Sequence, residues 1–248
     1  MASHPSVLLS AETRSADQTY VNLFAGPSVT VAGRRFDVPE GSKRLLAFVS
    51  LSRGPVERRR VAGTLWPLVD DVRAAGNLRS ALWRLKGSEI DVIECDKVCL
   101  WLRPTTVVDV DVLGAWAERL VAGRPRPGDL DVFPWHADHV ELFPGWYDDW
   151  ALFEREHQRQ LLLHALEALS RQLSVRGRGA EAVLAATAAV AAGPLRESAQ
   201  SALVEAHLCE GNLVEARRAY LTYRDIALRE LGVEPGARLQ SLITASQR

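Results

Sequence analysis

The side chains with the clearest chemical potential lie in one segment, Val72–Gly87, with the sequence VRAAGNLRSALWRLKG, here called the basic segment. Its apolar residues recur at helical spacing and predict one buried stripe, formed by Ala75, Leu78, Leu82 and Leu85. The opposite face carries Arg73, Asn77, Ser80 and Arg84, with Arg79 and Lys86 on its flank. No Asp or Glu lies within the basic segment. Arg, Asn and Ser can hydrogen-bond to base edges or phosphates, so the pattern favours a helix in the major groove of DNA. A solvated basic face is the alternative explanation.

Short β-like runs precede the basic segment and predict a small antiparallel sheet, because Gly and Pro separate them. These runs are Tyr20–Gly26, Ser28–Gly33 and Arg34–Pro39. Ser42 is then expected to cap a helix that Gly54 ends. A second helix is predicted from about Glu57 to Trp66, where Pro67 stops it.

The basic segment is predicted to begin a third helix, with Asp70 or Asp71 as its N-cap. Two more β-like runs follow it, Ile90–Cys95 and Val98–Arg103. The order of sheet, three helices and β-hairpin is typical of a winged helix-turn-helix. In such a domain Lys97, at the tip of the hairpin, is placed to meet phosphate. Arg58 and Arg59, near the start of the second helix, are candidates for further backbone contacts that carry no sequence information.

Two runs of sequence in this half are similar to a known family. GSKRLLAFVSLSRGPVERRRVAGTLWP followed by AAGNLRSALWRLKG resembles the DNA-binding half of SARP-type bacterial transcriptional regulators, whose winged helix is of the OmpR type. The resemblance covers nearly all of Val29–Arg103. It implies that Asn77, Arg79, Ser80 and Arg84 lie at or beside the DNA surface, and it leaves open which of them touches a base.

Trp83 falls on the polar side of the predicted third helix. It has two alternative roles: packing against sugar, phosphate or a thymine methyl, or covering the edge of its own domain beside the wing. We expect the second, because large aromatic side chains usually find internal cover.

The second half of the sequence predicts helices almost throughout. A helix is expected over Val112–Val121, then an exposed Pro/Gly-rich loop, then a long helix that opens at Pro144 and ends near Val175. Gly177 and Gly211 each precede a Glu-Ala pair by four residues, and the two units lie 34 residues apart, the period of a tetratricopeptide repeat. Further helices are then predicted at Glu181–Ala192, Pro194–Glu210, Leu213–Leu231 and Ala237–Ala245.

This half also resembles the SARP family, in its bacterial transcriptional activator domain. The markers are PGWYDDW, GPLRESAQSALVEAHLCEGN and YRDIALRELGVEPGARL. The resemblance implies a transcriptional activator that binds repeated DNA sites near promoters and helps hold RNA polymerase there. It also implicates the helical domain in self-association, so a homodimer is one possible state of the protein. The expected fold is an α+β winged helix followed by an all-α TPR-like domain, with a disordered leader at 1–20, the winged helix at 21–105 and the activator domain at 106–248.

Composition agrees with these expectations. Residues 1–103 hold 15 Lys and Arg against 11 Asp and Glu, whereas residues 104–248 hold 15 against 20, so a basic half precedes an acidic one. No apolar run approaches the length of a membrane span, and no signal peptide is recognisable, so we expect a cytoplasmic protein without a membrane partner. The cysteines Cys95, Cys99 and Cys209 lack paired or metal-ligand spacing and predict reduced thiols.

An enzyme is the least supported class. His136 and His139, with Asp138 and Glu141 nearby, form a polar loop cluster that is more typical of solvated side chains than of a metal site. His157 and His164 share a helix face without a nucleophile, and no GxxxxGK[ST] phosphate loop occurs. We therefore expect no catalysis and no cofactor. The alternative to a DNA-binding regulator is a TPR-like protein-interaction module whose winged helix does not bind DNA specifically.

Overall fold

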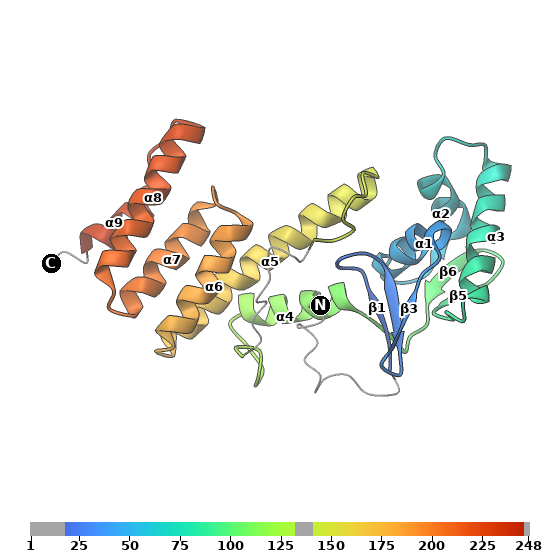
Figure 1. Ribbon diagram of the computed structural model, residues 1–248, viewed down its shortest axis with the longest axis horizontal. Helices are drawn as coiled ribbons and strands as arrows, with labels where there is room; N and C mark the ends of the chain where they lie inside the picture. Colours follow the sequence, from blue (N-terminus) through green and yellow to red (C-terminus); the bar gives the residue numbers. More distant parts are fainter. Residues whose placement is uncertain (1–17, 132–140, 246–248) are drawn as a thin grey trace. The chain divides into compact units, whose positions relative to one another are not determined.

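The computed structural model describes residues 18–131 and 141–245. Their contacts divide the chain into two compact units. The N-terminal unit contains 18–112 and, from further along the chain, 142–147; the helical unit contains the other described residues. The expected fold class, a sheet-containing winged helix followed by an all-helical TPR-like domain, is confirmed (Figure 1).

The N-terminal unit begins with a four-stranded sheet in the order β3-β2-β1-β7. Its strands are β1 (Thr19–Asn22), β2 (Ser28–Val31), β3 (Arg34–Asp37) and β7 (Thr106–Val108). Two boundaries differ from the prediction. Thr19 and Tyr20 belong to β1 rather than to the leader, because they pair with Val31 and Thr30; residues 1–17 lie outside the described residues. Strand β7 lies beyond the predicted domain end at residue 105, yet it pairs in parallel with β1 and is part of this sheet.

Three helices and a second sheet complete the N-terminal unit. The helices are α1 (Glu40–Leu51), α2 (Arg58–Leu65) and α3 (Asp71–Gly87). The second sheet has the order β4-β6-β5, from β4 (Val56–Glu57), β6 (Cys99–Leu102) and β5 (Ile93–Cys95). The predicted wing is thus the β5–β6 hairpin, and β4, which comes directly before α2, adds a third strand beside β6. The core between these elements is apolar and consists mainly of Leu45, Leu46, Val49, Val61, Leu65, Leu78, Leu85, Ile90, Val92 and Leu100.

Ser42 does not cap α1, and that prediction is wrong. The helix begins two residues earlier, after Pro39, and no side chain caps it. Ser42 is buried in the first turn instead, and its Oγ donates a hydrogen bond of 2.7 Å to the carbonyl oxygen of Ala81 in α3. The serine therefore joins two helices, a role that local sequence patterns do not reveal.

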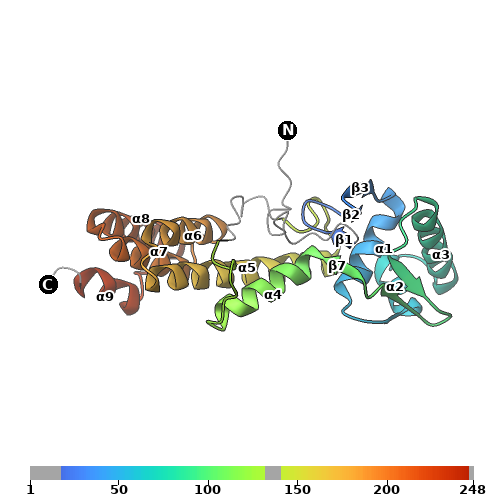
Figure 2. The same ribbon diagram turned by 90° about the horizontal axis from the view of Figure 1, so that it is seen from below.

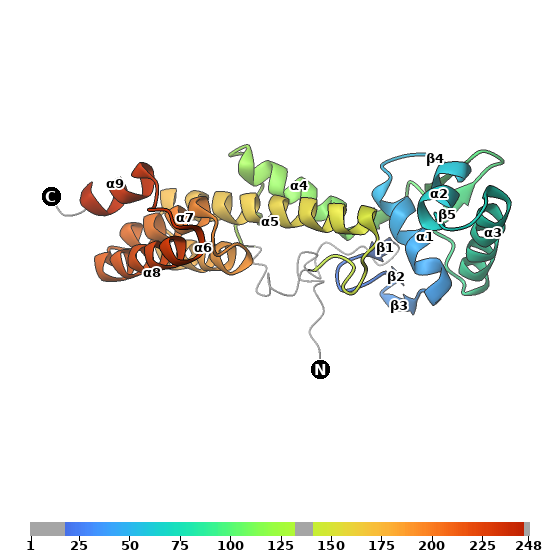
Figure 3. The same cartoon turned by 90° about the horizontal axis from the view of Figure 1, so that it is seen from above.

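The helical unit consists of six helices within the described residues, of which the second to the fifth stack in chain order. These are α4 (Asp109–Val121), whose first residues belong to the N-terminal unit, and then α5 (Asp149–Val175), α6 (Gly179–Ala192), α7 (Glu197–Cys209), α8 (Leu213–Leu231) and α9 (Ala237–Ala245). Figures 2 and 3 show α5 to α8 side by side, with α9 folded back beside α7. The predicted ends of α8 and α9 agree with the structure, whereas α6 begins two residues before its predicted start and α7 three residues after.

The 34-residue repeat corresponds to a structural repeat. Gly177 and Gly211 both adopt left-handed backbone, with φ of +73° and +78°, a conformation that glycine adopts without strain. Each ends one helix and starts the turn to the next. Ala182 and Ala216, five residues further on in each unit, are fully buried, so their small side chains let neighbouring helices pack closely.

The long helix α5 does not open at Pro144, as the sequence suggested, but at Asp149. The residues before it, Leu142–Tyr147, form an irregular segment of the N-terminal unit, here called the return segment. Leu142 forms an isolated β-bridge with Phe24, and Phe143 is fully buried. Phe143 stacks on Trp146 at 4.8 Å between ring centroids, and the Arg44 guanidinium of α1 lies 4.9 Å from the Trp146 ring. A segment of the predicted activator domain therefore completes the N-terminal core.

The Pro/Gly-rich loop after α4 is mostly exposed, as expected, apart from Asp129. The Asp129 carboxylate is buried and accepts two hydrogen bonds of 2.8 Å from Arg119. The indole of Trp116 donates to the carbonyl oxygen of the same residue at 2.9 Å. These bonds hold the loop against α4.

Candidate nucleic-acid interface

Helix α3 contains the whole basic segment, and charges at its two ends suit its dipole. Asp70 is the N-cap, and its carboxylate accepts the backbone N–H of Arg73 at 2.9 Å. Asp71 lies in the first turn, and Arg84 and Lys86 lie in the last. The prediction of an aspartate cap is therefore confirmed.

The buried face of α3 is rotated by about one residue from the predicted stripe. Its buried residues are Ala74, Leu78, Ala81 and Leu85, whereas Ala75 and Leu82 are only half-buried. The cause is packing on two sides, because α2 and α1 both contact the helix. The bond from Ser42 to the Ala81 carbonyl holds α1 against α3 where Ala81 is fully buried.

This rotation moves two predicted DNA-contacting residues towards α1. Asn77 is half-buried on the side of α3 that also carries Ala81 and Arg84. Arg84 remains exposed, and its Nη2 donates to the carbonyl oxygen of Gly41 at 3.3 Å. Both side chains thus lie at the edge of the exposed face rather than at its centre.

The centre of the exposed face is occupied by a row that adds Val72, Gly76 and Trp83 to the predicted residues Arg79 and Ser80. These five residues follow one another at helical spacing; Gly76 is half-buried and the other four are exposed. Trp83 is 76% exposed and Val72 is 80% exposed. The expectation that Trp83 covers its own domain edge is therefore wrong, because α1 and α2 already cover the other side of the helix. Gly76 was the sequence feature that could have indicated this row, since glycine is unfavourable inside a helix.

Four predicted cationic residues converge on one groove beside α3. Arg58, Arg59, Arg79 and Lys97 come from α2, α3 and the wing turn, and they line a groove of about 270 Å³ whose floor includes Ala74 and Leu78. Figure 1 shows α2, α3 and the β5–β6 hairpin together at this place. The groove also contains one acid, Asp71, which forms an ion pair of 3.0 Å with Arg59. The other three cations form no ion pair within the described residues.

The wing tip is held in a defined turn. The Asp96 carboxylate accepts the backbone N–H groups of Cys99 and Val98 at 2.6 and 2.7 Å, and these bonds hold the pKa of Asp96 below its usual value. Arg58 reaches the same turn, because its Nη1 donates to the Asp96 carbonyl oxygen at 3.2 Å. Lys97 is exposed between these anchored residues, so its ammonium group projects from a fixed backbone.

The remaining predicted site residues are dispersed along α3. Arg73 and Lys86 are exposed near its two ends and lie outside the groove. Ser80 is exposed as well, and its hydroxyl donates to the Gly76 carbonyl oxygen at 3.1 Å. The nine predicted residues thus form one groove cluster of four and a looser set of five on α3.

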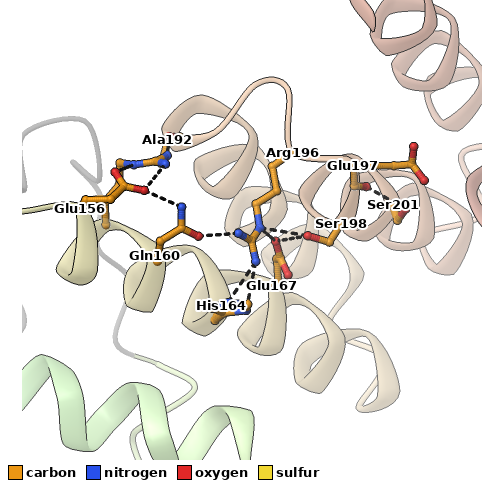
Figure 4. Close-up of polar contacts among 10 residues, drawn as sticks. Glu156, Gln160, His164, Glu167, Ala192, Arg196, Glu197, Ser198 and Ser201 are labelled. Atoms are coloured by element: carbon orange, nitrogen blue, oxygen red, sulfur yellow. Dashed lines mark hydrogen bonds and ion pairs between the residues drawn. The ribbon is translucent and has the colours of Figure 1, made fainter. Parts of the chain in front are cut away.

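An extended polar cluster outside this face is centred on Arg196 in the helical unit (Figure 4). Its guanidinium contacts the buried Glu167 carboxylate at 2.6 Å, Gln160 at 2.7 Å and the His164 ring at 3.1 Å. A groove of about 590 Å³ beside it is lined by no Ser, Cys or His. The cluster joins the start of α7 to α5, which gives it a structural role.

Over 18–131 and 141–245, no group of three or more His, Cys, Asp or Glu side chains is arranged to hold a metal ion. His136 and His139 lie outside the described residues. None of the helices in this part of the chain has the length and apolar character that a bilayer span requires.

Comparisons with known proteins found a family match in the helical half and a likeness of fold over most of the chain. Residues 134–245 match the family described as bacterial transcriptional activator domain. Among solved structures the chain is similar to Mycobacterium tuberculosis EmbR in complex with a low-affinity phosphopeptide, with a TM-score of 0.66 and 18% identity. That likeness covers 93% of this chain, which spans 66% of the length of the EmbR chain, and at this identity it concerns the fold. A search of curated proteins found no match.

Proposed function

We propose that this chain is a transcription regulator of the SARP type rather than an enzyme, and that it binds double-stranded DNA at specific sites through its N-terminal unit. In this proposal α3 enters the major groove, and Arg79 contacts a base edge. Arg58, Arg59 and Lys97 contact phosphates beside it. Arg73, Asn77, Ser80, Arg84 and Lys86 extend the surface along α3.

The groove beside α3 is the observation that carries the proposal. Four cations from three separate elements line it, and its one acid is already paired with Arg59. Cations brought so close together repel one another, so a fold gains nothing from this arrangement without an anionic partner. A row of phosphates along a DNA strand supplies such a partner.

We further propose that the helical unit takes part in the activation of transcription. Its family match supports contact with RNA polymerase at the promoter, and a homodimer on repeated sites fits the same proposal. Both activities place the protein in the bacterial cytoplasm, where the DNA is.

Fluorescence anisotropy with the full chain tests the DNA-binding proposal. The first probe is DNA from upstream of its own gene, with a scrambled duplex as control, and a pool of random duplexes widens the search if that DNA is not a target. Selective binding that weakens steeply with salt supports the proposal. Equal, weak binding to every duplex contradicts it and favours the alternative, a TPR-like protein-interaction module. RNA polymerase pull-down then tests the activation step separately.

Lys97→Ala is expected to weaken binding to specific and scrambled DNA by similar factors. The reason is that Lys97 projects from the wing tip towards phosphate, which carries no sequence information. The slope of log K against log salt should fall by about 0.9 for the lost phosphate contact. Arg60→Ala is the matched control, because Arg60 is exposed on α2 but does not line the groove. An unchanged slope for Lys97→Ala would exclude the wing tip from the interface.

A further inference from the structure

The outward-facing row of α3 combines an exposed aromatic side chain with a half-buried glycine that the fold does not require. Gly76 has ordinary helical backbone, because its φ is not positive. A methyl group at this position would lie 3.7 Å from its nearest neighbour, the Nη2 atom of Arg79, which is a normal contact distance. Alanine would therefore fit, and it would stabilise the helix relative to glycine. The missing side chain has no explanation inside the N-terminal unit.

Trp83 lies seven residues after Gly76, on the same row of the helix. Its indole is 76% exposed, so most of a large apolar surface faces outwards. Val72, 80% exposed, lies on the other side of Gly76 in the same row. An apolar row with a gap in its middle suits a partner that approaches the α3 backbone closely at Gly76.

The charge around this row identifies the partner. Arg73, Arg79, Arg84 and Lys86 surround Trp83 and Gly76, and no acid follows Asp71 before the end of α3. A protein partner with an apolar patch would not need this ring of cations. The major groove of DNA has phosphates on both sides, and its floor has one apolar group, the C5 methyl of thymine.

We propose that Trp83 is a specificity-determining residue that packs against a thymine methyl, while Gly76 allows α3 to approach the base edges. The inference rests on the proposed DNA-binding function and specifies one chemical group of the DNA that the protein recognises. The recognised sequence must then contain a thymine at the position facing Trp83. Arg79, one helical turn earlier, lies over the neighbouring base pairs and is suited to guanine.

Thymine-to-uracil substitution tests the methyl contact directly, because uracil pairs like thymine but lacks the methyl group. The full chain first selects its site from a pool of random duplexes. Each thymine in that site is then replaced singly by deoxyuridine. We expect one or two positions to lose about three- to fivefold in affinity with the wild-type protein. Trp83→Ala should lose at least about fivefold on the thymine site and show no further loss with uracil there. Trp83→Phe should keep part of the sensitivity.

Gly76→Ala is an independent variant whose folding is not in question. Its thermal midpoint should rise by about 2–6 °C, since alanine favours the helix. Its affinity for the selected site should nevertheless fall at least about fivefold, because the added methyl group occupies the gap. Higher stability with lower affinity is a combination that a merely structural role of Gly76 does not produce.

The possible outcomes distinguish the Trp83 inference from the proposed DNA-binding function. If the wild-type chain selects no site, the proposed DNA-binding function fails. If it selects a site but tolerates uracil at every thymine, the function stands and the Trp83 inference is overturned. The inference is also overturned if Trp83→Ala binds the site with wild-type affinity but no longer captures RNA polymerase or a second copy of the chain. That result would assign the row to a protein partner.

Discussion

Arg79→Ala is expected to reduce affinity for the selected DNA site by about 1–3 kcal/mol, or roughly 5- to 150-fold, while binding to scrambled DNA falls much less. Arg79 is the one cation that belongs both to the exposed centre of α3 and to the groove shared with Arg58, Arg59 and Lys97. Its side chain forms no hydrogen bond or ion pair within the described residues, so it is available to donate two hydrogen bonds to one base. The difference between specific and scrambled binding measures base readout.

Two matched variants make this experiment decisive. Arg60→Ala removes an equally exposed arginine from α2 that does not line the groove, and it should change specific affinity by less than about twofold. Arg84→Ala removes an arginine that already contacts the Gly41 carbonyl oxygen at the edge of α3. Its effect should be smaller than that of Arg79→Ala. If Arg84→Ala or Asn77→Ala costs more specific affinity than Arg79→Ala, the centre of the recognition surface lies nearer α1 than we propose.

The elements of the N-terminal unit were predictable because each carries its own local signal. Alternation, Gly and Pro define the strands, Asp70 defines the start of α3, and Pro67 ends the helix before it. The 34-residue spacing of Gly177 and Gly211 likewise predicted the turns of the helical unit. In each case the residues that determine the structure are neighbours in the sequence.

The errors arose where distant residues decide the structure. The rotation of α3 depends on the bond between Ser42 and Ala81, which are 39 residues apart. A period of 3.6 residues places Ala75 and Ala74 almost equally well on a buried stripe, so only packing against α1 and α2 distinguishes them. That small rotation decides whether Asn77 or Trp83 lies at the centre of the candidate interface.

The domain boundary was affected in the same way. The sequence PGWYDDW was expected to open a long helix of the helical domain, because it precedes a long amphipathic stretch. The structure instead assigns 144–147 to the N-terminal unit, where Trp146 is buried beside Arg44, and the preceding Leu142 pairs with Phe24; both partners lie about a hundred positions earlier. No local pattern encodes a contact over that separation.

This return segment leads to the second large effect, which is on stability. Phe143→Ala is expected to lower the free energy of unfolding of the N-terminal unit by about 3–5 kcal/mol. Phe143 is fully buried, it stacks on Trp146, and its removal leaves a cavity beneath the cation–π contact with Arg44. Domains are usually stable by only about 5–15 kcal/mol, so a loss of this size should unfold a measurable fraction of the unit.

Hydrogen exchange of the full chain, followed peptide by peptide, shows which elements lose stability in Phe143→Ala. Loss of protection is expected in β1 and α1, although the substitution lies within the region that matches the activator-domain family. Helices α6 to α8 should keep their protection. Tyr147→Ala is the matched control, because this neighbouring aromatic side chain is 80% exposed and its loss should change stability by less than about 0.5 kcal/mol.

The same variant distinguishes two views of how the chain is organised. If the return segment belongs energetically to the helical unit, Phe143→Ala will deprotect the start of α5 and leave α1 unchanged. If it belongs to the N-terminal unit, DNA affinity will fall as well, because α1 supports α3 through the bonds from Ser42 to Ala81 and from Arg84 to Gly41. A residue outside the predicted winged helix would then control DNA binding through the position of α1, without touching DNA.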